Sequence, residues 1–170
     1  MNLAAATIPQ FQKMLKNLDV WLEKAVVHAK AKSFDPAILL QSRLAPDQYP
    51  LIRQIQAACD AAKLAAARLA AKDAPKHPDT EQTLDEIRAR LHQVIEYLGT
   101  FSPGDFEGYE SRMLTLPFLP GKAIGGEDYL VELAIPNFYF HVNAAYAILR
   151  HNGVDIGKND YIGSLNVKDA

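Results

Sequence analysis

Residues 136–153, PNFYFHVNAAYAILRHNG, form the most informative helical pattern in the chain. Apolar side chains recur there at the spacing of a buried helix, and Gly153 stands where a glycine can take the left-handed conformation that ends one. We expect this helix to begin near Glu127. Pro136 lies inside it and predicts a kink or interruption, because the proline ring clashes with the carbonyl four residues earlier.

Three segments that precede this helix in the chain also have helical periodicity, at about 8–32, 46–71 and 80–100. We expect Thr7 to cap the first, with a proline in its first turn, and Asp79 or Thr80 to cap the third. The short connections between these three helices favour antiparallel neighbours. The sequence therefore predicts one all-α domain over residues 1–170, an up-down four-helix bundle.

Residues 102–126 interrupt the helical pattern with many prolines and glycines and form a long crossover between the third and fourth helices. Residues 112–118 and 122–124 predict a small β-hairpin around the turn at 119–121. The apolar side chains at 113–119 must cover either the end of the bundle or a partner subunit.

The 170 residues carry a net charge of −2, which gives no reason to expect nucleic acid or an anionic membrane as a partner. The apolar window 130–149 contains too many polar groups to cross a bilayer, so we expect a cytoplasmic protein. The single cysteine, Cys59, excludes an internal disulfide and lies in an alanine-rich helix, where a buried packing role is expected.

His141 is the leading candidate for a functional residue, because it lies on the core-facing side of the last helix. It can bind a metal, transfer a proton or form a hydrogen bond across the bundle. Asp47 and Gln54 are the polar side chains expected on the apolar face of the second helix. Asp60 falls on the opposite, polar face, where a solvated carboxylate is expected. Ala145 stands at the position where a second histidine would share a metal with His141.

Arg150 and His151 occupy the last turn of the fourth helix, where positive charge is favoured by the helix dipole. They are candidates for binding an anion, or for fixing the C-terminal tail through Asp155 or Asp160. The tail after Gly153 is rich in turns, and we expect it to fold back over the bundle.

Two strings, RLAPDQYPLIRQIQAACDAAKLAAARLA at 43–70 and PNFYFHVNAAYAILRHNGVDIGKNDYIG at 136–163, resemble a bacterial domain family of unassigned function. That family is grouped with the DinB-like, or YfiT-like, four-helix metalloenzymes. The resemblance implies a four-helix bundle with a long crossover, and a homodimer. It also implies a divalent metal held by three histidines, one from the second helix and two, spaced HxxxH, from the fourth.

Only His141 matches that ligand pattern, since the second helix has no histidine and the fourth has no HxxxH. Two hypotheses therefore stay open. The first is an enzyme that binds a divalent metal or a small molecule around His141, helped by Asp47 or Gln54. The second is a non-catalytic, homodimeric interaction protein that uses the apolar residues 113–119 as an interface, on a scaffold that has lost its metal site.

Overall fold

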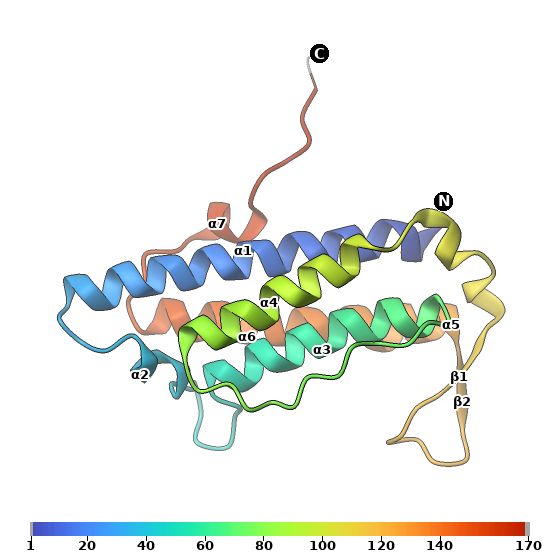
Figure 1. Cartoon of the computed structure of the whole chain (residues 1–170), viewed down its shortest axis with the longest axis horizontal. Helices are drawn as coiled ribbons and strands as arrows, with labels where there is room; N and C mark the ends of the chain where they lie inside the picture. The colour runs from blue at the N-terminus through green and yellow to red at the C-terminus, as the bar shows by residue number, and fades with distance from the viewer. Residues whose placement is uncertain (1, 169–170) are drawn as a thin grey trace.

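Four long helices form the body of the computed structural model, which describes residues 2–168 (Figure 1). They are α1 (Leu3–Ala31), α3 (Leu51–Leu69), α4 (Leu84–Gly99) and α6 (Ile135–His151). The shorter helices are α2 (Ala37–Leu40), α5 (Gly126–Asp128) and α7 (Lys158–Ile162), with 3-10 turns at Pro103–Phe106 and Tyr109–Ser111 and a π-helix at Tyr129–Ala134. The structure confirms the predicted four-helix bundle.

Helix α1 begins five residues earlier than predicted, and its cap is Asn2 rather than Thr7. The Asn2 side chain accepts a hydrogen bond from the backbone of Ala5 at 3.0 Å and donates one to the carbonyl of Phe106 at 3.1 Å. The alanines that follow Asn2 favour a helix, so the helix extends N-terminally until this tertiary contact ends it.

Helix α3 begins at Leu51, later than the predicted start at 46 or 47, and Pro50 precedes it in an extended conformation. A residue before proline is disfavoured in a helix, so Pro50 keeps Tyr49 out of the helix. The residues before them form a turn. Asp47 lies exposed in that turn and not on the apolar face of α3, so its predicted position was wrong.

Helices α3 and α4 run parallel, whereas the short connection between them predicted antiparallel neighbours (Figure 1). Arg90 of α4 contacts the carbonyl of Gln56 near the start of α3, while Tyr97 contacts the carbonyl of Asp73 beyond its end. The connecting segment 70–83 returns along α3. Extended, its residues can span about 46 Å, ample for the roughly 28 Å of a 19-residue helix.

Helix α4 is capped by Thr83, not by Asp79 or Thr80. Thr83 accepts from the backbone of Glu86, and the Glu86 carboxylate accepts from the backbone of Thr83, which completes a capping box. Asp79 is engaged elsewhere, in ion pairs with two arginines. The long-range pairing of Asp79 therefore sets where the connecting segment ends and the helix begins.

The predicted hairpin is present as β1 (Met113–Thr115) and β2 (Ala123–Gly125), with Leu114 opposite Ile124. The Arg112 side chain donates to the carbonyl of Leu69 and ties the hairpin to the end of α3. Directly after β2, a Cβ on Gly126 would lie 1.9 Å from the carbonyl oxygen of Tyr109. Only glycine allows the crossover to approach the last helix this closely.

The interruption predicted around Pro136 takes the form of a π-helix, which joins α5 to α6 without a break. The backbone N–H of Ile135 bonds the carbonyl of Leu130, five residues back, so the wider turn accommodates the proline. The helix ends as predicted: Gly153 has a φ of +86°, and Val154 bonds back to the carbonyl of Leu149.

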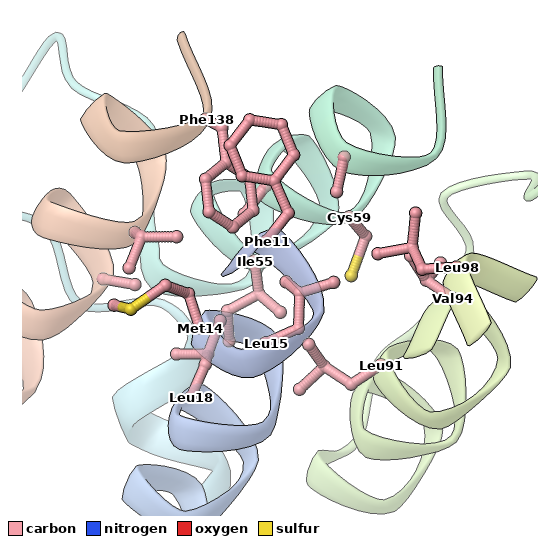
Figure 2. Packing of buried hydrophobic residues seen from close by; sticks show 14 of the residues in the cluster. Phe11, Met14, Leu15, Leu18, Ile55, Cys59, Leu91, Val94, Leu98 and Phe138 are labelled. Carbon is pink, nitrogen blue, oxygen red and sulfur yellow. The ribbon is translucent and has the colours of Figure 1, made fainter. Parts of the chain in front are cut away.

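The core lies where the four helices meet (Figure 2). Phe11 of α1 stacks on Phe138 of α6 with ring centroids 4.1 Å apart. Cys59 packs among the leucines and valine of α4, and burial raises the pKa of its thiol to about 12. The predicted packing role of Cys59 is therefore confirmed.

The tail folds back onto α1, as expected. The Trp21 indole donates to the carbonyl of Asp160 at 3.1 Å, and Asn17 donates to the carbonyl of Tyr161 at 2.9 Å. Lys24 forms an ion pair with the Asp160 carboxylate. None of the helices within residues 2–168 combines the length and hydrophobicity needed to cross a bilayer.

Candidate functional site

A pocket of about 420 Å³ lies between α3, the π-helix and α6, with the turn of the hairpin at one side. This space is left between the backbones by small side chains, which are Ala57 and Ala61 of α3 and Ala134 of the π-helix. The polar residues that line it are Tyr49, Arg53, Asp60, Arg68, Asp79, Tyr129, Asn137 and His141. Its volume lies within the range of small-molecule sites.

His141 of α6 and Gln54 of α3 are hydrogen bonded to each other, and the distance from Nδ1 of His141 to Oε1 of Gln54 is 2.8 Å. The Gln54 side chain is fully buried, and its Nε2 donates to the carbonyl of Tyr49 at 3.2 Å. That bond fixes the amide with its oxygen toward His141, so Nδ1 must carry the proton and donate. Nε2 of His141 then holds a lone pair and is the ring nitrogen available to a molecule in the pocket.

Burial lowers the pKa of His141, because charging the imidazole in this setting would remove the ion from water. The Gln54 partner is uncharged and does not offset that cost. His141 is therefore neutral at pH 7. A neutral imidazole with a fixed tautomer can accept a hydrogen bond, accept a proton or coordinate a metal.

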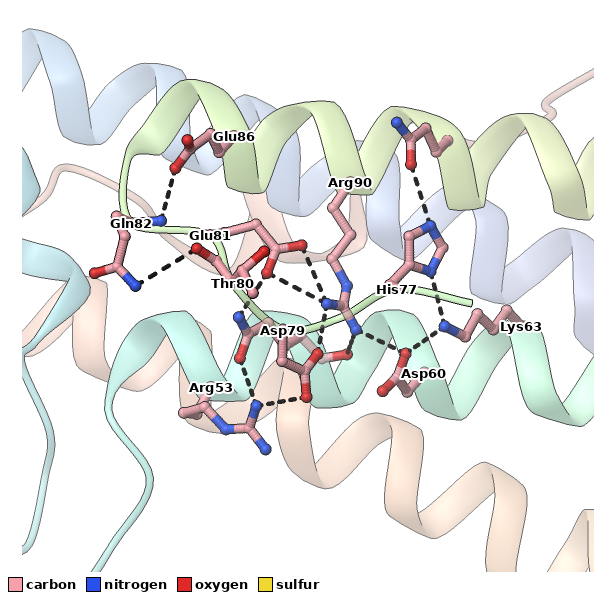
Figure 3. A network of polar contacts seen from close by, with 12 residues as sticks. Arg53, Asp60, Lys63, His77, Asp79, Thr80, Glu81, Gln82, Glu86 and Arg90 are labelled. Atoms are coloured by element: carbon pink, nitrogen blue, oxygen red, sulfur yellow. Dashed lines mark hydrogen bonds and ion pairs between the residues drawn. The ribbon is translucent and has the colours of Figure 1, made fainter. Parts of the chain in front are cut away.

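Segment 70–83 covers part of the predicted polar face of α3 (Figure 3). Gln56 and Lys63 are buried there, and Lys63 donates to Nδ1 of His77 at 2.7 Å. Asp60 accepts ion pairs from Arg90 and from Lys63, both at 2.7 Å. Asp60 is still 34% exposed, but the prediction of a solvated carboxylate missed these ion pairs, since the covering segment could not be inferred from helical periodicity.

Arg90 of α4 is the centre of this polar cluster and is 2% exposed. Its guanidinium pairs with Asp60, with Asp79 at 2.6 Å and with Glu81 at 3.1 Å. Burial disfavours the charge on Arg90, but the hydrogen bond that Arg90 donates to Asp79 and the charge of Asp60 raise the pKa of Arg90. Arg53 holds the second oxygen of Asp79 at 2.7 Å. These ion pairs neutralise the charges along one wall of the pocket.

Arg68 lies at the last turn of α3, toward the end of the pocket that is farther from His141. Its Nη1 donates to the hydroxyl of Tyr129 at 3.0 Å, and its guanidinium lies 5.6 Å from the centroid of that ring. Arg68 forms no salt bridge with any residue that the structure describes. Sequence reasoning missed this residue, although Arg53, Asp60 and Arg68 share one helical face at spacings of seven and eight residues.

The donor set around His141 does not fit a three-histidine metal centre. Within residues 2–168 no group of three or more His, Cys, Asp or Glu side chains is placed to hold a metal ion. Asp60 is the acidic residue that α3 contributes to the pocket lining, and its carboxylate is already paired with two cations. The site is consequently better described by hydrogen bonding than by metal coordination.

The remaining predicted residues lie away from this pocket. Asp47 is exposed in the turn before α3, and Arg150 and His151 are exposed at the C-terminal end of α6. Arg150 donates to the carbonyl of Val154, the first residue of the tail, while the Asp160 carboxylate pairs with Lys24 and not with Arg150 or His151. Of the predicted residues, the structure brings only His141 and Gln54 together.

Comparison with known proteins agrees with this architecture. A solved structure described as a DinB family member protein from Shewanella denitrificans is 48% identical, with a TM-score of 0.95 over 99% of this chain and 96% of that one. No curated protein matches the chain. Residues 3–162 match a family described as a domain of unknown function, DUF1993. The chain therefore belongs to the DUF1993 family and has a DinB-like fold.

Proposed function

We propose that this protein binds a small organic molecule in the α3–α6 pocket and that Nε2 of His141 accepts a hydrogen bond or a proton from it. The observation that carries the proposal is the hydrogen bond between His141 and Gln54, whose amide is oriented by the carbonyl of Tyr49. A buried glutamine whose amide oxygen holds one imidazole in a fixed orientation is suited to a binding or proton-transfer site.

The chemistry that this arrangement supports is proton abstraction by a neutral base. His141 is uncharged at pH 7 and presents one lone pair, while Asn137 lies one helical turn earlier on the same wall. A divalent metal at His141 would have one imidazole and only oxygen ligands, a weaker site than three histidines provide. Metal binding is therefore an outcome to be tested against the small-molecule proposal.

The test is a thermal-shift screen of small organic acids, alcohols and amides, with Ni²⁺, Zn²⁺ and Mn²⁺ in separate arms. Compounds that bind the pocket should stabilise the wild type and His151→Gln, whose substitution lies outside the pocket, but not His141→Gln. At a hundred times its Kd, such a ligand adds about 2.7 kcal/mol to the free energy of unfolding.

The proposal fails if every stabilising compound acts equally on His141→Gln. A shift produced by a metal alone, and lost in His141→Gln, would instead favour the metal-binding hypothesis. Long-range ¹H–¹⁵N spectra of the histidine side chains provide an independent check, because they report whether Nδ1 of His141 carries the proton.

The hairpin favours the second hypothesis, a homodimeric interaction protein. Met113 and Phe118 are 64% and 61% exposed, although both are large and apolar. We propose that a second copy of this chain covers them. Light scattering after gel filtration should give twice the monomer mass for the wild type and a lower mass for Met113→Ser; a monomeric wild type contradicts this proposal.

A further inference from the structure

We propose that the molecule in the pocket is an elongated organic anion whose acid group pairs with Arg68, at the end of the pocket opposite His141. This inference rests on the proposed function and names the class of ligand. It follows from the charges of the pocket walls, from the surroundings of Arg68 and from the distance between the two ends.

Every other ionic group of the pocket wall is neutralised by a neighbour. Asp60, Asp79 and Glu81 provide three negative charges, and Arg53, Arg90 and Lys63 provide three positive ones in direct contact with them (Figure 3). Among the described lining residues, Arg68 is then the cation that remains without an acidic partner. A pocket with one uncompensated positive charge favours an anionic ligand.

The surroundings of Arg68 hold its guanidinium in place without using most of its donors. The hydroxyl of Tyr129 accepts from one nitrogen, and the guanidinium carbon lies 5.6 Å from the centroid of the buried tyrosine ring. A guanidinium has five N–H donors in a rigid fork that matches a carboxylate with two parallel bonds. Arg68 is therefore positioned and has donors left for an acid group.

The two ends of the pocket are far apart and separated by a largely apolar stretch of α3. Arg68 follows Gln54, the partner of His141, by fourteen residues, which is about 21 Å along the helix. Between them α3 lines the pocket with Ala57, Ala61 and Leu64, and with Asp60, whose carboxylate is paired with Arg90 and Lys63. A ligand that reaches both ends must have an apolar middle, an acid group at one end and a hydrogen-bond donor at the other.

The test is titration of the full chain with 12-hydroxydodecanoate and with 12-hydroxydodecanamide, followed by ¹H–¹⁵N correlation spectra. The two probes share length and shape and differ in charge. We expect the carboxylate to bind at least about tenfold more tightly, the difference that a charge-assisted contact provides. Arg68→Gln should remove that preference. Arg68→Lys should keep part of it, because lysine retains the positive charge but cannot form two parallel hydrogen bonds to a carboxylate.

Arg150→Gln is the matched control, since Arg150 is an exposed arginine outside the pocket, and it should retain the wild-type preference. If the amide binds as tightly as the acid in a His141-dependent manner, the anion inference is wrong and the proposed function stands. If Arg68→Gln keeps the preference for the acid, Arg68 is not the contact. If neither probe gives saturable shifts, this ligand class is rejected, while the thermal screen tests the pocket separately. Should Arg68→Gln fail to fold, the ratio of the Kd for the amide to the Kd for the acid is compared between the wild type and Arg68→Lys. A ratio that is equal in the two proteins would contradict the assignment of Arg68 as the contact.

Discussion

Two groups of polar side chains lie along α3 and differ in how completely their bonding capacity is used. In the cluster around Arg90, under segment 70–83, three carboxylates meet three cations, and within this cluster, as far as the structure describes it, Nε of Arg90 is the one buried side-chain atom without a partner. In the pocket, His141 has one engaged nitrogen, and Arg68 has a neutral hydroxyl as its partner.

The difference separates groups that hold the fold from groups that are available to a ligand. A buried charge costs several kcal/mol unless it is paired, so a saturated cluster stabilises the position of segment 70–83 only as long as every member is present. Groups with unused donors or lone pairs at a pocket contribute less to folding and keep that capacity for a bound molecule. The following predictions test this distinction.

The largest effect is expected for Arg90→Met. Removing the guanidinium leaves Asp60, Asp79 and Glu81 without their common cation, and breaking a buried pair in this way costs about 3–5 kcal/mol. The measurement is the free energy of unfolding in urea. Arg68→Met is the matched control and should cost about 1 kcal/mol or less, because its protein partner is a neutral hydroxyl. Equal losses in the two variants would contradict the distinction.

A smaller effect is expected for Gln54→Leu, which leaves the Nδ1–H of His141 without an acceptor. An unsatisfied buried donor costs about 1–3 kcal/mol. The double variant Gln54→Leu, His141→Phe removes both partners, and its loss should be less than the sum of the two single losses. Strict additivity in urea unfolding would show that the two side chains are not coupled.

The smallest effect is the contribution of His141 to the pH dependence of stability. Its pKa is lowered by burial, so the unfolded chain binds a proton more readily than the folded one. Stability should therefore fall as the pH drops below about 6.5, the ordinary histidine value, and recover above it.

Burial and the charge of Lys63 also lower the pKa of His77. Both histidines therefore contribute to the slope of the unfolding free energy against pH in the wild type. We expect His141→Gln to have a shallower slope between pH 7.5 and pH 5.5 in urea unfolding. His151→Gln, an exposed position on the same helix, should retain the wild-type slope. An unchanged slope in His141→Gln would mean that the imidazole is solvated in the folded protein.

Part of the candidate site could be predicted from the sequence because it depends on helical periodicity. The core-facing position of His141 and the apolar stripe that carries Gln54 both follow from three- and four-residue spacing. Asp47 was misplaced because one proline, Pro50, delays the start of α3. Arg68 was missed because nothing local distinguishes a paired arginine from an unpaired one.

The sequence by itself determined the four helices, the hairpin before the last of them and the glycine that ends it, since these depend on local propensity and spacing. It also showed that two of three expected histidine ligands are missing. Only the tertiary structure decided that segment 70–83 returns along α3, that Tyr49 orients Gln54 toward His141 and that Arg68 keeps unused donors. The physical reason is that ion pairs and hydrogen bonds join residues distant in the sequence, and local patterns do not record which partners meet.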